Sequence, residues 1–158
     1  LRSAVLFARQ GAWSGVANNV SLLLNNAAVM ASTEGWQILE VVLQLSHQAS
    51  MTGSARDLLI RLLPVVEPLQ RRVVQQRLGQ LADADKQPVQ AAIWYLQAAT
   101  EVPHADYFAW QSRLDAAASL EQAGLHDDAQ LQYELVLKTS MDAAQQAAAN
   151  YALSTRQY

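Results

Sequence analysis

Cysteine is absent from this chain, which excludes disulfide bonds, thiolate zinc sites and cysteine nucleophiles. Glycine and proline are scarce, with 6 and 4 residues among 158, too few for an all-β chain with many tight turns. Only 16% of the residues are charged, against about 25% in an average soluble domain. No run of 18 apolar residues occurs either, so we expect no transmembrane helix in this sequence.

The residues that are present favour helices. Hydrophobic residues make up 51% of the chain, and alanine, leucine and glutamine, all good helix formers, are frequent in it. A chain of 158 residues can form one domain with its own hydrophobic core, so we expect an all-α domain. The net charge is -3, and the one basic cluster, Arg71, Arg72 and Arg77, is short. Nucleic acid is therefore not an expected partner.

No arrangement of residues in the sequence points to catalysis. The three histidines, His47, His104 and His126, lie far apart, and no metalloprotease spacing such as HExxH occurs. The carboxylates are scattered, and neither a nucleophile elbow nor a glycine-rich phosphate loop is present. His126 precedes Asp127 and Asp128, but a solvated turn explains this better than a catalytic pair. We expect no enzyme activity, no cofactor and no metal site.

The stretch from Leu78 to Pro103 carries the most specific pattern in the chain. Small, aromatic and proline residues follow Gly79 at offsets of 3, 12, 16, 19 and 24: Ala82, Ala91, Tyr95, Ala98 and Pro103. These residue types at these offsets resemble the tetratricopeptide repeat (TPR), a helical hairpin of about 34 residues. The resemblance implies a stacked helical scaffold that binds other chains.

A second unit repeats the pattern 38 residues later. Ala129, Tyr133 and Val136 follow Gly124 at 5, 9 and 12, the offsets at which Ala91, Tyr95 and Ala98 follow Lys86. The first unit predicts helices at roughly 71–84 and 88–100. The second predicts a helix at roughly 107–123, Gly124 in the left-handed conformation that ends a helix, and Asp127 as the N-cap of the next helix.

Two weaker units lie upstream. Gly53 is expected to mark a turn after a helix at roughly 33–51, and Gly11 an earlier turn. A terminal helix is expected after Ser140. The predicted fold is therefore an all-α solenoid of about four stacked antiparallel hairpins plus a terminal helix. The resemblance is closest over residues 71–140 and looser before them. We expect residues 1–158 to form a single TPR-like domain, a segment of a longer solenoid.

The resemblance also implies a partner-binding face. In TPR proteins, four positions on the first helix of each hairpin line the concave groove. The residues carried over to these positions are Val73, Gln76, Gln80 and Asp83 in the clearest unit, Gln111, Leu114, Ala118 and Glu121 in the next, and Glu40, Leu43, His47 and Ser50 in the weaker unit upstream. The terminal helix would add Gln145 and Ala148. The alternative is that this concave face binds no partner and is the solvated surface of a spacer segment.

The mapped positions also argue against one ligand. None of them is lysine, arginine or asparagine, the residues with which TPR co-chaperones hold the C-terminal carboxylate of heat-shock proteins. An acidic C-terminal peptide is therefore not the expected ligand. The four tryptophans, Trp13, Trp36, Trp94 and Trp110, suit either sugar stacking or core packing, and we expect core packing.

The predicted function is a non-catalytic protein-interaction scaffold with a protein or peptide partner, and self-association is a further possibility. The alanine- and glutamine-rich, lysine-poor composition resembles bacterial proteins, and by analogy the scaffold would serve envelope, secretion or exopolysaccharide-export assemblies. The bacterial periplasm is the first expectation for its location, and the cytoplasm the alternative. Two other functions stay open: a regulatory sensor module attached to another domain, and a carbohydrate-binding solenoid.

Overall fold

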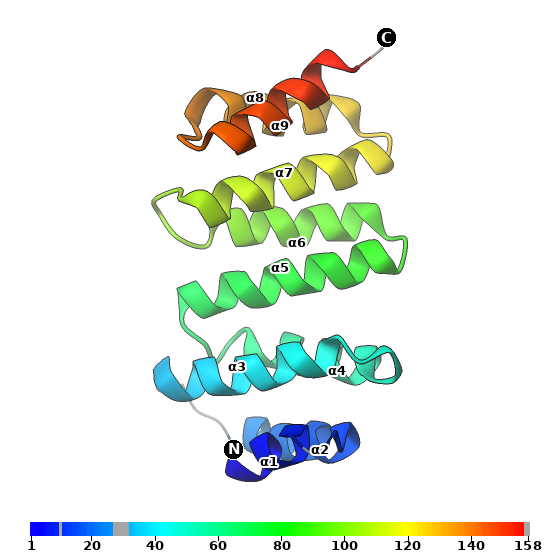
Figure 1. Ribbon diagram of the computed structural model, residues 1–158, viewed down its shortest axis with the longest axis vertical. Helices are drawn as coiled ribbons and strands as arrows, with labels where there is room; N and C mark the ends of the chain where they lie inside the picture. Colours follow the sequence, from blue (N-terminus) through cyan, green and yellow to red (C-terminus); the bar gives the residue numbers. More distant parts are fainter. Residues whose placement is uncertain (10, 27–31, 157–158) are drawn as a thin grey trace. The chain divides into compact units, whose positions relative to one another are not determined.

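The part of the chain that the structure describes folds into short helices, and several neighbouring helices are joined by tight turns (Figure 1). The computed structural model describes residues 1–9, 11–26 and 32–156, and this part of the chain contains helices and no strand, which confirms the all-α prediction. The helices are α1 (Arg2–Arg9), α2 (Trp13–Asn25), α3 (Ser32–Ser46), the 3-10 helix η1 (Ala49–Met51), α4 (Thr52–Leu62), α5 (Pro68–Ala84), α6 (Pro88–Thr100), α7 (Tyr107–Gln122), α8 (His126–Thr139) and α9 (Ala143–Ser154).

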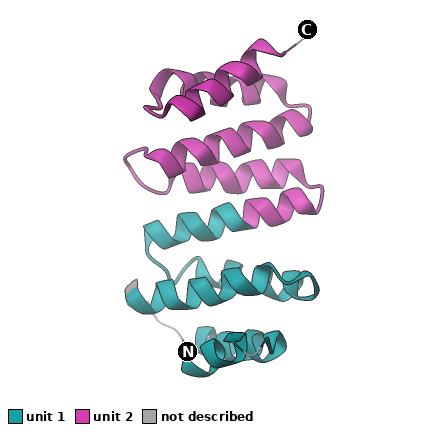
Figure 2. Ribbon diagram, viewed as in Figure 1, with its two compact units in different colours: residues 1–77 teal, residues 78–158 magenta. Residues whose placement is uncertain are grey.

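The helices form two compact units, Leu1–Arg77 and Leu78–Tyr158 (Figure 2). The division falls within α5, so residues 68–77 of this helix belong to the first unit and residues 78–84 to the second. The prediction of a single repeat domain depends on how the two units are arranged, and it stays a prediction.

The first unit is built around the buried side of α3. Ile38, Val42 and Leu45 recur at helical spacing, and each is at most 3% exposed. Helix α3 packs against α4, and α2 packs against both of them. Arg61 of α4 also bonds the end of α2, where its guanidinium donates to the Ser21 hydroxyl over 2.7 Å and to the Ser21 carbonyl over 2.8 Å. These bonds tie α4 to the last two turns of α2.

In the second unit each helix packs against the next along the chain, and α7 also contacts α9. Small residues allow this close approach. Ala91 and Ala116 are fully buried in a cluster with Tyr95, and Ala117 is fully buried in a second cluster with Tyr133. The alanines and tyrosines of the sequence pattern therefore lie in the core between helices, as expected.

Three turns end their helices in the same way. Gly11, Lys86 and Gly124 have φ angles of +71°, +60° and +76°. After each of them, the next amide donates to a carbonyl five residues back, as Leu125 does to Leu120 over 2.9 Å. These are Schellman motifs, which favour glycine because the left-handed conformation strains other residues. The prediction for Gly124 is confirmed, and Lys86 occupies the same conformation at the equivalent position.

Two local predictions are wrong. Gly53 does not mark a turn: α3 ends at Ser46, Gln48 is extended, and Gly53 lies in the first turn of α4 after the 3-10 helix. Asp127 is not an N-cap, because the tight Schellman turn starts α8 at His126. Leu125 therefore occupies the cap position, and no side chain bonds the first amides of the helix. Asp127 lies in the first turn instead, where a negative charge favours the helix dipole.

The contrast between Gly53 and Gly124 makes a prediction. A methyl group added at either position would have no heavy atom within 4 Å, so backbone conformation alone decides the effect. Gly124→Ala should lower the free energy of unfolding by about 1 kcal/mol, because φ is positive. Gly53→Ala should raise it by about 0.5 kcal/mol, because alanine favours a helix. Urea unfolding monitored by circular dichroism measures both changes. Changes of the same sign would contradict the helical conformation assigned to Gly53 or the left-handed conformation assigned to Gly124.

Candidate functional site on helix α3

Helix α3 exposes a stripe of large side chains on the side away from its core. Trp36, Glu40 and Leu43 of α3, and His47 one residue beyond its end, are spaced four, three and four residues apart, so successive members lie about one helical turn apart. Trp36 is 44% exposed, whereas Trp13, Trp94 and Trp110 are half-buried. The core-packing prediction is therefore wrong for Trp36. It lies one helical turn before Glu40, a position that the resemblance assigns to the groove.

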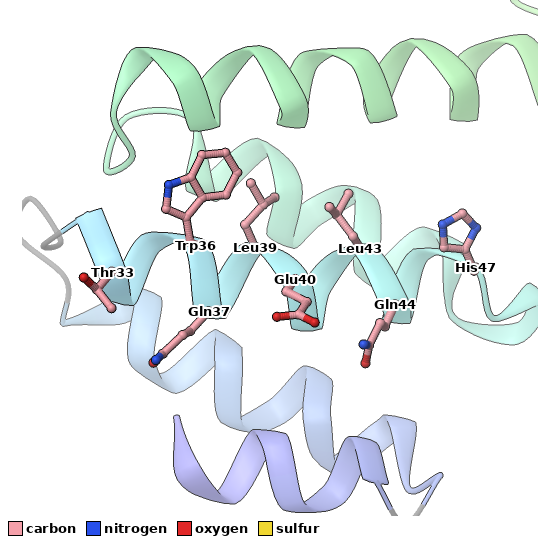
Figure 3. A pocket seen from close by; sticks show the side chains of 8 residues that line it. All are labelled: Thr33, Trp36, Gln37, Leu39, Glu40, Leu43, Gln44 and His47. Carbon is pink, nitrogen blue, oxygen red and sulfur yellow. The ribbon is translucent and has the colours of Figure 1, made fainter.

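This stripe lines an open cavity of about 610 Å³. In Figure 3, Trp36, Leu39 and Leu43 point toward one side of α3, and Gln37, Glu40 and Gln44 point toward the other. The cavity thus joins an apolar side, headed by an indole ring, to a side of two amides and a carboxylate. Glu40, Leu43 and His47, three residues that the resemblance places in the concave groove, line the same cavity.

A second cavity of about 800 Å³ lies between α1 and α3. Gln37, Glu40 and Gln44 line it from α3, and the side chains of Arg2, Val5, Leu6 and Arg9 line it from α1. The two cavities share the polar side of α3. Helices α1 and α3, the first helices of two successive hairpins, therefore present one hollowed surface, which is the arrangement that a groove requires.

His47 stands at the far end of the α3 cavity as a hydrogen-bond donor. Arg77 donates from Nη2 to His47 Nδ1 over 3.2 Å, and arginine has no acceptor, so Nδ1 must be the unprotonated nitrogen. The remaining nitrogen, Nε2, then carries the proton. Arg77 is itself fixed by Ser46, whose hydroxyl and carbonyl accept from it over 2.7 and 2.9 Å. This end of the cavity thus favours an acceptor on the ligand, such as a carbonyl oxygen.

In the second unit, the predicted groove residue Asp83 joins three helices. Its carboxylate accepts from the Tyr95 hydroxyl of α6 over 2.9 Å and from the Ser119 hydroxyl of α7 over 2.9 and 3.1 Å. Asp83 therefore holds α5 to the next hairpin in addition to any contact with a partner. The sequence offered no signal for this role, because Ser119 lies 36 residues away and belongs to no part of the repeat pattern.

The other predicted groove residues differ in exposure. Gln76 is half-buried in the first unit, and Gln80, one turn further along α5, is exposed. Gln111 is half-buried and donates from Nε2 to Asp115 over 3.2 Å. Leu114 is 8% exposed and packs in the core with Tyr133, so it offers little surface to a partner. Gln145 of α9 is also buried, and it donates to the carbonyl of Tyr107 over 2.9 Å.

Glu121, the last predicted groove residue, lies in a cluster of charges. His126 Nδ1 donates to its Oε2 over 2.7 Å, and Arg156 donates from Nε to its Oε1 over 2.7 Å. Burial alone raises the pKa of Glu121, but hydrogen bonds from Arg156 and His126 and the charges of these groups outweigh it. The pKa therefore lies below its ordinary value of 4.5.

This lowered pKa predicts a pH-dependent contribution to stability. A carboxyl group whose pKa falls on folding stabilises the fold above its ordinary pKa, and that contribution is lost as the pH drops through the lowered value. The wild-type chain should therefore exceed Glu121→Gln in stability at neutral pH, and the difference should shrink below about pH 4.5. Urea unfolding from pH 7 to pH 3 measures it, and a constant difference would show that the charge of Glu121 contributes nothing.

The described residues offer neither a metal site nor a membrane span. Within residues 1–9, 11–26 and 32–156, no group of three histidine, cysteine, aspartate or glutamate residues is placed to hold a metal ion. In the same part of the chain, no helix combines the length and the hydropathy needed to cross a membrane. The groups gathered on α3 are an aromatic ring, amides, a carboxylate and an imidazole donor, all of which bind ligands through stacking and hydrogen bonds.

The chain matches no protein-family model, no curated protein and no solved structure. Its resemblance to TPR proteins therefore rests on residue types and spacing alone.

Proposed function

We propose that this chain is a non-catalytic scaffold that binds a protein or peptide partner, as the TPR resemblance implies. In this proposal the hairpins continue through both units as one α-solenoid. The observation that carries it is the α3 cavity, because Glu40, Leu43 and His47, which the TPR resemblance assigns to the groove, line one hollow together. Contacts between first helices also support it, since α7 contacts α9 and Asp83 bonds Ser119.

The cavity suits an extended peptide with one large apolar side chain. Trp36 and Leu43 offer an apolar surface for that side chain, and exposed aromatic side chains are common anchors in protein interfaces. Gln37 and Gln44 can bond a peptide backbone, and His47 donates toward a carbonyl oxygen. Envelope, secretion or exopolysaccharide-export assemblies of bacteria, in the periplasm before the cytoplasm, remain the proposed setting, and a regulatory module attached to another domain remains the alternative.

Selection of peptides on the immobilised chain tests this proposal. Peptides taken from a random phage-displayed library should lose at least about tenfold in affinity when Trp36 is replaced by alanine, the loss expected for a central aromatic anchor. Ile60→Ala is the matched control, because Ile60 is 46% exposed on α4 and lines neither α3 cavity. Selected peptides that bind the Trp36 variant and the wild type equally would refute the α3 surface as the binding face.

Carbohydrate binding is a second candidate function, favoured by the exposure of Trp36. An indole ring beside Gln37, Glu40 and Gln44 offers both a stacking face and hydrogen-bonding groups for sugar hydroxyls. Titration with oligosaccharides separates the two candidates. If sugar binds at the α3 cavity, tryptophan fluorescence should change in the wild type and in Ile60→Ala but not in Trp36→Ala. No change at millimolar sugar would exclude this candidate.

A further inference from the structure

The tail after α9 places one arginine side chain in a built site on the preceding helices. Arg156 lies two residues beyond the last residue of α9, yet its side chain is only 10% exposed. Its Nη2 donates to the His126 carbonyl over 2.7 Å and also to Glu121 Oε1, and its Nη1 donates to Gln130 Oε1 over 3.2 Å. The guanidinium carbon lies 5.8 Å from the centre of the Tyr133 ring. Charge pairing, hydrogen bonding and cation–π contact thus meet on one guanidinium.

The groups that receive this guanidinium are held without help from the tail. Tyr133 is 8% exposed and packs in the core with Leu114 and Ala117. Glu121 and His126 flank the Schellman turn at Gly124, and His126 holds Oε2 of Glu121, which leaves Oε1 for the guanidinium. Arg156 itself contributes to the lowered pKa of Glu121, but a carboxyl group with its ordinary pKa of 4.5 is charged at neutral pH without that help. Helices α7 and α8 therefore keep the shape and charge of the site when Arg156 leaves it.

The surroundings leave room for a larger ligand. A cavity of about 630 Å³ adjoins the site, lined by Glu121, His126, Tyr133 and Arg156 and by Asp127, Tyr151, Ala152 and Thr155. Asp127 adds a second carboxylate, and Tyr151, which is 71% exposed, adds a second aromatic ring. Two carboxylates and two aromatic rings around one cavity favour a cationic ligand, and the planar contacts to Glu121, Gln130 and the His126 carbonyl favour arginine over lysine.

We propose that this site on α7 and α8 binds an arginine side chain of a partner polypeptide, and that Arg156 occupies it as an intramolecular competitor until the partner displaces it. The inference deepens the proposed function, because Glu121 is one of the predicted partner contacts. Displacement requires Thr155 and Arg156 to move away from α7 and α8, and Arg156 lies outside any helix. The partner can bind only those molecules in which Arg156 has left the site. The fraction of such molecules therefore sets the apparent affinity of the partner.

Binding of N-acetyl-L-arginine amide to the whole chain tests the proposal without a partner protein. The probe is titrated while the backbone amides of Glu121, Gly124 and His126 are followed by nuclear magnetic resonance. Arg156→Ala should bind it at least about tenfold more tightly than the wild type, because a competitor that fills the site in nine molecules of ten reduces affinity by that factor. Adding Glu121→Gln to this variant should weaken binding by at least about tenfold, and N-acetyl-L-lysine amide should bind at least tenfold more weakly than the arginine probe.

Equal binding of the arginine probe to the wild type and Arg156→Ala, or equal binding of the arginine and lysine probes, would overturn the proposal. If Arg156→Ala does not fold, the same titration is carried out on the wild type. Displacement of Arg156 by the probe must then shift the Nε resonance of Arg156. An unmoved resonance at saturating probe would again overturn it. The peptide selection on α3 reports on the scaffold function separately, so failure of this arginine site leaves that result unaffected.

Discussion

Replacing Asp83 with alanine should lower the free energy of unfolding by about 2 kcal/mol, the range expected for hydrogen bonds to a charged group. The carboxylate accepts from the buried Tyr95 hydroxyl and from the Ser119 hydroxyl, so its loss removes one group that joins α5, α6 and α7. Asp83 lies in the last turn of α5, where a negative charge opposes the helix dipole by about 0.3–1 kcal/mol. Because that term alone would make the alanine variant more stable, a net loss must come from the bonds.

The two hydroxyls should contribute unequally. Ser119 also donates to the carbonyl of Asp115 over 3.1 Å, so it keeps an acceptor in the alanine variant, whereas Tyr95 loses the carboxylate. Tyr95→Phe should therefore cost much less in the Asp83→Ala background than in the wild type. Asp83→Asn is the conservative control, because its amide oxygen keeps the shape and one acceptor, and it should cost less than half as much. Equal costs for Tyr95→Phe in both backgrounds would show that the Tyr95 bond contributes nothing.

The helices were predictable where local signals agree with one another. Residues 88–100 were expected as a helix and form α6 with the same bounds, because Pro88 starts it at a position that needs no amide donor. Gly124 was also predictable, since glycine adopts the left-handed conformation without strain and is common at the end of a helix. The prediction for Gly53 was wrong because a glycine without a positive φ is an ordinary helical residue. The helix is instead interrupted at the extended Gln48, a residue type that carries no distinctive sequence signal.

The candidate site was predictable only in part. The TPR resemblance placed Glu40, Leu43 and His47 together, and they line one cavity. The partners of Glu121 and Asp83 were not foreseen, because Arg156 lies 35 residues from Glu121 and Ser119 lies 36 from Asp83. Such contacts depend on how separate helices are placed, and no single-helix pattern contains that information. The exposure of Trp36 was missed for a related reason, since an aromatic residue on a helix face suits a core and a binding surface equally.

Replacing Gly79 with alanine should lower the free energy of unfolding by about 2 kcal/mol. The added methyl carbon would lie 2.5 Å from Cε1 and 2.6 Å from Cδ1 of the Tyr95 ring, closer than real contacts allow. The ring cannot easily move, because it is 3% exposed and Asp83 holds its hydroxyl at 2.9 Å. Overpacking of this kind costs about 3 kcal/mol at the upper end of its range, and the better helix propensity of alanine returns about 1 kcal/mol.

A double-mutant cycle with Tyr95→Leu separates these two effects. Leucine removes the ring atoms that the new methyl group meets, so Gly79→Ala should lose its cost in that background and raise the free energy of unfolding by up to about 1 kcal/mol. The change of sign is the critical observation, because a general intolerance of α5 to substitution would leave the cost unchanged. Urea unfolding of the four variants measures the coupling. A cost that persists beside leucine would show that Gly79 is required for something other than the close approach of the Tyr95 ring.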